Sequence, residues 1–155
     1  MVAVSPKASL QAELNKIAEL LSVLKQEQQD LVAADIEHLT GLTPHKSALV
    51  NDMALLATQR HRALATAGFP AQESGMEAWL AGAQDAEASQ MWQALLEQTR
   101  EAKELNRLNG LLINKHLSTT QGALQALRPQ GPGGAFYGPS GHTTTSSSRR
   151  GFIAG

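Results

Sequence analysis

The sequence contains no cysteine, few aromatic residues and no long apolar run. Without cysteine there is neither a disulfide framework nor thiol chemistry. No stretch of about 18 apolar residues occurs, so no segment is predicted to span a membrane. The first residues also lack the basic region and apolar run of a secretory signal. Aromatic residues make up 4% of the chain, whereas Leu, Ala and Gln are frequent, which favours helices that pack along apolar stripes.

The patterns of common catalytic and metal sites are also missing. Carboxylates are spread along polar faces and form no acid/base pair, and the Ser- and Thr-rich segment near the end has no nucleophile elbow. The glycine cluster from Gly131 lacks the lysine, strand and helix of a phosphate loop. The histidines are His38, His45, His61, His116 and His142. No two share a helix face at a spacing of three or four residues, and none lies in a Glu/His cluster typical of zinc sites. We expect no enzyme, no metal and no cofactor.

Charge is distributed unevenly along the chain. Three of the 13 basic residues, Arg128, Arg149 and Arg150, lie at or after position 128, where there is no acidic residue. The preceding part therefore carries 10 basic and 14 acidic side chains. An acidic helical body argues against nucleic acid as a partner.

The first helix is predicted from Ser5-Pro6 to about Ala34. Ser5 can cap the first amide groups, and proline is tolerated at the first helical position. The charged face opposite the stripe includes Glu13 and Glu27. Apolar residues recur at alternating steps of three and four, as in an amphipathic helix: Leu10, Leu14, Ile17, Leu21, Leu24 and Leu31.

Thr40-Gly41 is predicted to break the helical pattern. The second helix is predicted to start at Thr43-Pro44, where a capping residue precedes a proline. It should end at Gly68, where glycine suits the left-handed position after a helix and Phe69 can fold back on Leu64. The short connection makes the first two helices antiparallel neighbours. Ser74 to Glu77 fits a capping box, which starts a short helix that stops at Gly82.

The longest element is predicted from an Asp85 cap to Leu127, because the residue before Pro129 is pushed out of the helical region. Such a helix is roughly 60 Å long, too long for the rest of the chain to cover. Its first apolar stripe comprises Met91, Leu95, Ala102, Leu105 and Leu112, with Gln98 and Asn109 in the polar gaps. A second stripe comprises Ile113, Leu117, Thr120, Leu124 and Leu127. Part of the apolar surface of this helix is therefore expected to bind a partner.

Asn109-Gly110 lies between these stripes and allows two interpretations. It is either a helix end with a turn, or a continuous helix with a thin place where another helix or peptide approaches closely. A glycine inside a helix costs about 1 kcal/mol relative to alanine.

The fold class predicted is all-α: an elongated, antiparallel, coiled-coil-like helical bundle with a long C-terminal helix. Residues 5–128 form the helical domain. Residues 129–155, rich in Gly, Pro and Ser, are predicted to be a flexible tail. Within the tail, Phe136-Tyr137-Gly138 is an aromatic island with no core to join.

At this point the chain resembles the FlgN-type flagellar export chaperones. Residues 106–113, NRLNGLLI, resemble the N-x-x-N-G-x-L-I signature of that family's last helix. Lys46 and Leu49 stand where the family's second helix begins, and the order of a Leu-rich helix end, Pro and an aromatic-Tyr-Gly element agrees as well. The Gly/Pro segment and the Thr/Ser run are similar in character only.

The resemblance implies a non-enzymatic cytoplasmic chaperone. Its clients would be the C-terminal helical ends of the two hook–filament junction proteins, delivered to the export gate and ATPase apparatus of flagellar type III export. We assign client binding to Asn109, Gly110, Ile113, Leu117, Thr120, Leu124 and Leu127. The resemblance assigns export-gate docking to Phe136, Tyr137 and Gly138.

Other interpretations stay open from sequence alone. The second stripe could be filled by a second copy, in a self-associating coiled-coil protein, or the chain could be an adaptor for an unrelated partner. Residues 113–127 could also pack under the first helix. The pair Phe136-Tyr137 could fold back over Leu124 and Leu127.

Overall fold

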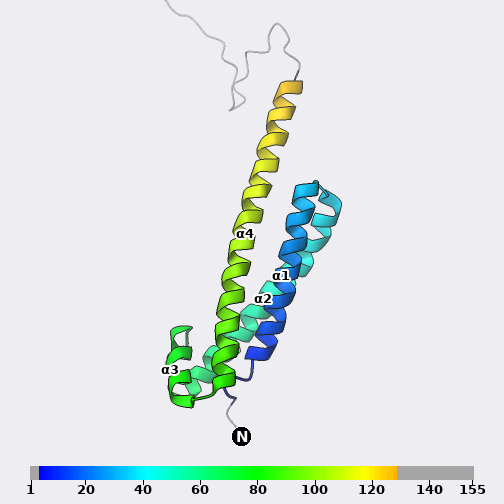
Figure 1. Ribbon diagram of the computed structural model, residues 1–155. Coiled ribbons are helices and arrows are strands. Elements are labelled where there is room, and N and C mark those ends of the chain that lie inside the picture. Colours follow the sequence, from blue (N-terminus) through cyan, green and yellow to red (C-terminus); the bar gives the residue numbers. More distant parts are fainter. Residues whose placement is uncertain (1–3, 129–155) are drawn as a thin grey trace, which may run out of the picture. The chain divides into compact units, whose positions relative to one another are not determined.

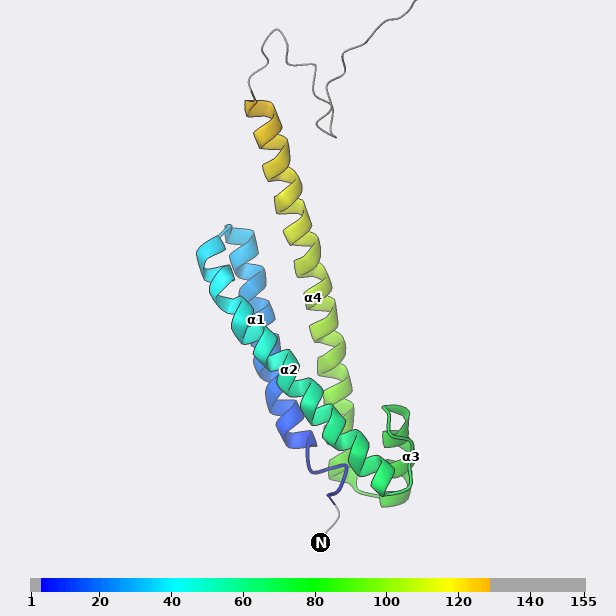
Figure 2. The ribbon, with the colours of Figure 1, turned by 180° about the vertical axis from the view of Figure 1, so that it is seen from behind.

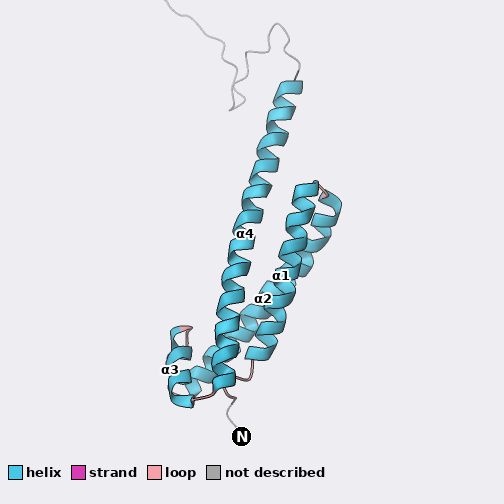
Figure 3. Cartoon of the chain, in the orientation of Figure 1, coloured by secondary structure: helices cyan, strands magenta, loops and turns pink. Residues whose placement is uncertain are grey.

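The computed structural model describes residues 4–128, and every regular element in that range is an α-helix (Figures 1 and 3). The helices are α1 (Leu10–Ala33), α2 (Ile36–Thr66), α3 (Ser74–Ala83) and α4 (Ala86–Leu127). The predicted all-α helical bundle is therefore confirmed. The predicted tail, with Phe136, Tyr137 and Gly138, lies outside the described residues.

The chain divides into two units between Lys115 and His116. The first contains α1 to α3 and α4 as far as Lys115, and all of the core described below belongs to it. The described part of the second unit, residues 116–128, consists of the last turns of α4.

Helices α1 and α2 lie side by side and antiparallel (Figures 1 and 2). Two residues join them: Ala34 is left-handed with φ 56°, and the Asp35 carboxylate accepts the His38 backbone N–H at 3.1 Å. The predicted end of the first helix is confirmed, but its start is not. Ser5 to Ser9 form turns instead, in which the Ser5 hydroxyl accepts the Lys7 N–H at 3.1 Å and the α-helix begins at Leu10.

Helix α2 runs unbroken through Pro44, so the predicted break at Thr40-Gly41 and the start at Thr43-Pro44 are wrong. Proline removes one N–H from the helix ladder. The Asp35 cap starts the helix one turn before Thr40, and the packing of α2 along α1 carries it across the weak point. The hydroxyl of Thr40 donates to the Ile36 carbonyl at 2.8 Å and adds a bond in this segment.

The end of α2 is as predicted. Gly68 has φ 89°, its N–H donates to the Ala65 carbonyl at 3.0 Å, and the Phe69 N–H donates to the Leu64 carbonyl at 2.9 Å. These two bonds define a Schellman motif. Phe69 is half-buried against the core cluster that contains the fully buried Leu64.

The predicted capping box at Ser74 is wrong, although the short helix α3 is present. The Ser74 hydroxyl accepts from the Gln72 side-chain amide at 2.9 Å, and the residue at the cap position is Glu73. A side chain at Gly75 would meet the Pro70 carbonyl oxygen at 2.1 Å, so this close approach to the first turn of α3 requires glycine. The Asp85 cap on α4 is confirmed, because the Asp85 carboxylate accepts the Ala88 N–H at 3.0 Å.

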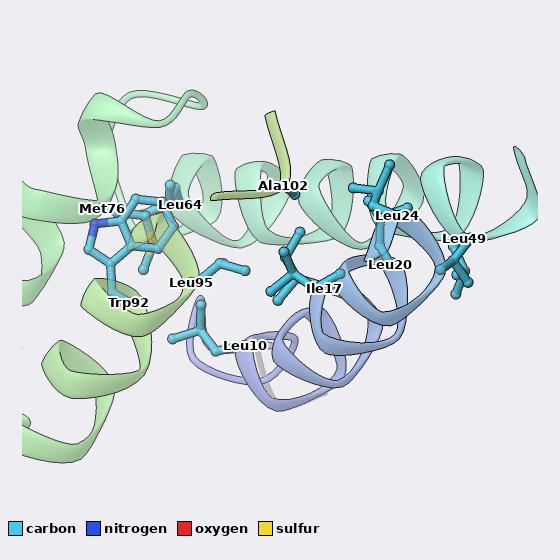
Figure 4. Close-up of a cluster of buried hydrophobic side chains, with 12 residues drawn as sticks. Leu10, Ile17, Leu20, Leu24, Leu49, Leu64, Met76, Trp92, Leu95 and Ala102 are labelled. Carbon is cyan, nitrogen blue, oxygen red and sulfur yellow. The ribbon is translucent and has the colours of Figure 1, made fainter. Parts of the chain in front are cut away.

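All four described helices contribute to one core (Figure 4). Helix α1 supplies half of its residues, α2 contributes Leu49 and Leu64, α3 contributes Met76, and α4 contributes only residues before position 110. Its largest fully buried members are Leu10, Ile17, Leu24, Leu64, Met76 and Trp92. Leu95 and Ala102 confirm the first predicted stripe of α4.

A buried arginine stands at the end of the bundle where the four helices meet. The Arg60 side chain is 3% exposed and lies 4.7 Å above the Trp92 ring. Its guanidinium donates to the Glu13 carboxylate at 3.0 and 3.1 Å and to the Glu73 carboxylate at 3.0 and 3.1 Å. Burial alone would lower the pKa of Arg60, but the bonds to Glu13 and Glu73 outweigh it and raise the pKa.

We predict that Arg60→Ala lowers the free energy of unfolding by about 3–5 kcal/mol, because it leaves the buried Glu13 carboxylate unpaired. Arg62→Ala is the matched control, since Arg62 lies two residues away on α2 and is exposed. The control should change the free energy by about 0.5 kcal/mol or less. Urea denaturation followed by circular dichroism measures both, and equal effects would contradict the structural role of Arg60.

Candidate functional site

The second predicted stripe is exposed along α4. The exposed fractions are 39% for Ile113, 57% for Leu117, 64% for Leu124 and 80% for Leu127, and Thr120 is exposed as well. Ile113 belongs to the first unit and the other four residues to the second. We call these five residues the α4 stripe. An apolar helix face of this length left in water is a feature of binding surfaces.

The α4 stripe continues the face of α4 that is buried in the core. Leu95, Ala102 and Asn109 follow one another at intervals of seven residues and are all buried. Ile113 follows Asn109 by four residues, and the later members follow at steps of four, three, four and three. Such steps keep residues on one helix face. In this series Asn109 is the last buried residue, and the next member, Ile113, is 39% exposed.

Asn109 does not belong to an exposed surface, contrary to its assignment from sequence. It is 1% exposed. Its side-chain amide donates to the Leu24 carbonyl at 3.0 Å and to the Glu27 carboxylate at 2.8 Å. Its nitrogen is therefore used inside the bundle, and the residue joins α4 to α1.

Asn109 is one member of a polar cluster that sequence analysis missed. Lys46 on α2 donates to the Glu27 carboxylate at 3.2 Å and to the Asn106 side-chain oxygen at 2.7 Å. Glu27 is buried although it was assigned to the charged outer face of the first helix, and so is Glu13. The signal was available, because both lie seven residues from the buried Leu20 and so share its face.

Gly110 lies within the uninterrupted helix α4, so the interpretation of Asn109-Gly110 as a helix end is wrong. A methyl group built on Gly110 would meet nothing within 4 Å. No described residue therefore approaches the backbone there, and the space over Gly110 is open to a partner. Gly122, farther along α4, is equally open.

Residues 4–128 contain neither a candidate metal cluster nor a candidate membrane span. No group of three or more His, Asp or Glu side chains there could hold a metal ion. No helix in the same range is long and apolar enough to cross a membrane. Of the described residues assigned to client binding, the five of the α4 stripe form an exposed helix face, whereas Asn109 is buried.

The fold and the α4 stripe define an α-helical bundle with an exposed apolar helix face. The model of the family described as FlgN protein matches residues 1–145, and the chain belongs to this family.

Individual relatives agree with the family match. Over 149 residues, 95% of each chain, the protein is 29% identical to the flagella synthesis protein FlgN of Yersinia enterocolitica. It is 30% identical over 131 residues to the protein of that name from Salmonella typhimurium, which covers 83% of this chain and 82% of the relative. The protein of the same name from Escherichia coli K12 is 29% identical over 131 residues. No solved structure matches the chain significantly.

Gly110→Ala and Gly122→Ala should each stabilise the protein by up to about 1 kcal/mol, because alanine loses less backbone freedom in a helix than glycine. Neither methyl group meets a neighbour. Thermal unfolding monitored by circular dichroism measures the change. A loss of stability in Gly110→Ala alone would show that a part of the chain packs closely over this glycine.

Proposed function

We propose that this protein is a cytoplasmic chaperone of flagellar assembly. It binds the C-terminal helical segments of the hook–filament junction proteins, prevents their premature assembly and delivers them to the flagellar type III export gate. Membership of the FlgN family supports the flagellar role, and the relatives carry the name flagella synthesis protein. The observation that carries the binding role is the exposure of the α4 stripe.

The chemistry of the α4 stripe suits the capture of an amphipathic helix. A helix bound in this mode places its own residues at positions i, i+3, i+4 and i+7 against a matching apolar face. Complete burial of each Leu or Ile contributes on the order of 1.5–3 kcal/mol. Ordering a client segment costs about 2–5 kcal/mol or more. Several stripe residues acting together are therefore needed for net binding.

Gly110 remains part of the proposed client surface, whereas Asn109 does not. The open space over Gly110 lets a client helix approach the α4 backbone, next to the first exposed stripe residue, Ile113. Asn109 instead fixes α4 on α1 just before the stripe begins.

Self-association through α4 is the second candidate, since the same apolar face could pair with a second copy. Charge disfavours it. From Leu105 to Arg128 the chain has the cations Arg107, Lys115 and Arg128 and no acidic residue. Two copies of this segment would bring like charges together, which costs pairing energy. Light scattering at micromolar concentration and after tenfold dilution separates a stable dimer from a chaperone without its client.

We predict that Leu117→Asp with Leu124→Asp abolishes client binding and leaves helicity unchanged, because both side chains are exposed. The matched control is Leu111→Asp with Ser118→Asp. These exposed positions have the same spacing on the same helix but lie off the stripe, and the added charge is identical. Calorimetric titration with a C-terminal junction-protein peptide measures binding. If the stripe variant unfolds, or if the control also loses binding, the stripe is not the client site.

We also propose that Phe136, Tyr137 and Gly138 dock on the export gate. The support is the resemblance of this element to the aromatic-Tyr-Gly element of the family and the chemistry of tyrosine. Tyrosine combines a large rigid contact area with a polar tip and is enriched at binding hot spots. These residues lie outside the described range.

Tyr137→Ala should leave thermal stability and client affinity within error and reduce export and motility. Tyr137→Phe, which keeps the ring, tests whether contact area or the hydroxyl matters. Secretion assays and swimming in soft agar measure the effect. Weak client binding by Tyr137→Ala would place Tyr137 in the client site, and normal export would remove it from the mechanism.

A further inference from the structure

The first unit carries a groove of about 240 Å³ that is separate from the α4 stripe. Its floor is apolar and comes from α1, with Ile17, Leu20 and Leu24, which Figure 4 shows among the core side chains. Helix α2 lines it with Val50 and Met53, and α4 lines it with Thr99 and Ala102. The remaining lining residues are Lys46 of α2 and Lys103 and Asn106 of α4.

The α2 side of this groove exposes apolar surface. Val50 is 51% exposed, and Met53 is half-buried against the core. Both lie on the face of α2 that borders the groove, three residues apart, so they present a continuous apolar wall. An apolar side chain inserted between this wall and the floor would remove both surfaces from water and gain the hydrophobic contribution.

The charge of the groove is of one sign. Two lysines line it and no carboxylate does. This is notable because all 14 acidic residues of the chain lie between Glu13 and Glu104, the same part of the sequence that forms the groove. The Lys46 ammonium is engaged by Glu27 and Asn106. Lys103 is exposed, and none of the ion pairs between residues of the described range includes it. The unpaired cation at the edge of an apolar groove therefore favours a ligand that is apolar and anionic.

We propose that this groove docks an amphipathic helix of a partner protein, which inserts apolar side chains over Val50 and pairs an Asp or Glu with Lys103. The interaction is additional to the proposed capture of clients by the α4 stripe and uses different residues. The chain's own residues from Leu105 to the end do not fit as the occupant, because they contain five basic residues and no acidic one.

The size of the groove sets the kind of contact. A volume of about 240 Å³ holds a few side chains and not a whole helix. The partner helix therefore lies over the groove and inserts one face. Small interfaces of this kind are typical of transient complexes, so we expect fast exchange and an affinity that depends on salt concentration.

The test uses the full-length chain labelled with ¹⁵N and two synthetic peptides of about 14 residues, nearly four helical turns. Both carry leucine at the same amphipathic positions. One has glutamate and the other lysine beside the leucines. We expect the glutamate peptide to shift the amide signals of Val50, Met53, Thr99 and Lys103. The lysine peptide should leave these signals unchanged.

Lys103→Glu should weaken binding of the glutamate peptide about fivefold or more, since one attraction becomes a repulsion. Lys115→Glu is the control: Lys115 is also an exposed lysine of α4, but it does not line the groove. Its effect should be less than about twofold. Val50→Asp should remove binding without unfolding the protein, because the side chain is half exposed.

Three results would overturn the proposal. Equal binding of the two peptides would remove the role of charge. Shifts confined to Leu117–Leu127, or equal losses in Lys103→Glu and Lys115→Glu, would place the acidic peptide elsewhere on α4. If light scattering gave Val50→Asp a lower mass than the unmodified protein, the groove would be an interface between two copies of this chain, and a second copy would be its occupant. The Leu117→Asp, Leu124→Asp variant should still bind the glutamate peptide, which keeps this test independent of client binding.

Discussion

The pairing of the buried Arg60 guanidinium with two carboxylates fixes the end of the bundle on which the rest of the first unit depends. Arg60 belongs to α2, Glu13 to α1, Glu73 immediately precedes α3, and Trp92 of α4 lies against the guanidinium. A buried charge is tolerated only when its hydrogen-bonding capacity is used. Because its partners come from each neighbouring segment, Arg60 permits one mutual arrangement of the four helices at this end.

A second polar cluster defines where the burial of α4 stops. Asn109 bonds to the Leu24 carbonyl and to Glu27, and Glu27 also binds Lys46. The core residues buried between Arg60 and Asn109 are apolar, so the two polar sites fix the register of α4 much as a buried asparagine does in a coiled coil. A helix held at Trp92 and at Asn109 presents Ile113 at a defined orientation, on the face that continues from the core. The proposed client surface therefore begins where internal packing ends.

The two proposed binding surfaces differ in chemistry. The α4 stripe is a convex helix face of Ile, Leu and Thr, whereas the groove over Ile17 and Leu20 is concave and has Lys103 at its edge. A convex apolar face selects a partner by helical spacing, and a concave site with a charge selects by side-chain type as well. The proposed functions can therefore be separated by mutation. This separation suits a protein that holds one partner while it meets another.

Local spacing and cap chemistry in the sequence determined the all-α class, the end of α2 at Gly68, the Asp85 cap of α4 and the exposed stripe from Ile113. These features depend on residues within about one helical turn of each other. The tertiary structure decided the rest. Pro44 lies inside α2 because packing on α1 outweighs a local break, and Ser74 does not form its capping box. Glu13 and Glu27 are tolerated in the interior because they pair with Arg60 and Asn109. These partners lie 47 and 82 residues away in the sequence. The spacing from Leu20 places both carboxylates on the inner face, but which distant side chain pairs with each depends on which helices meet, and neighbouring residues in the sequence carry no record of that.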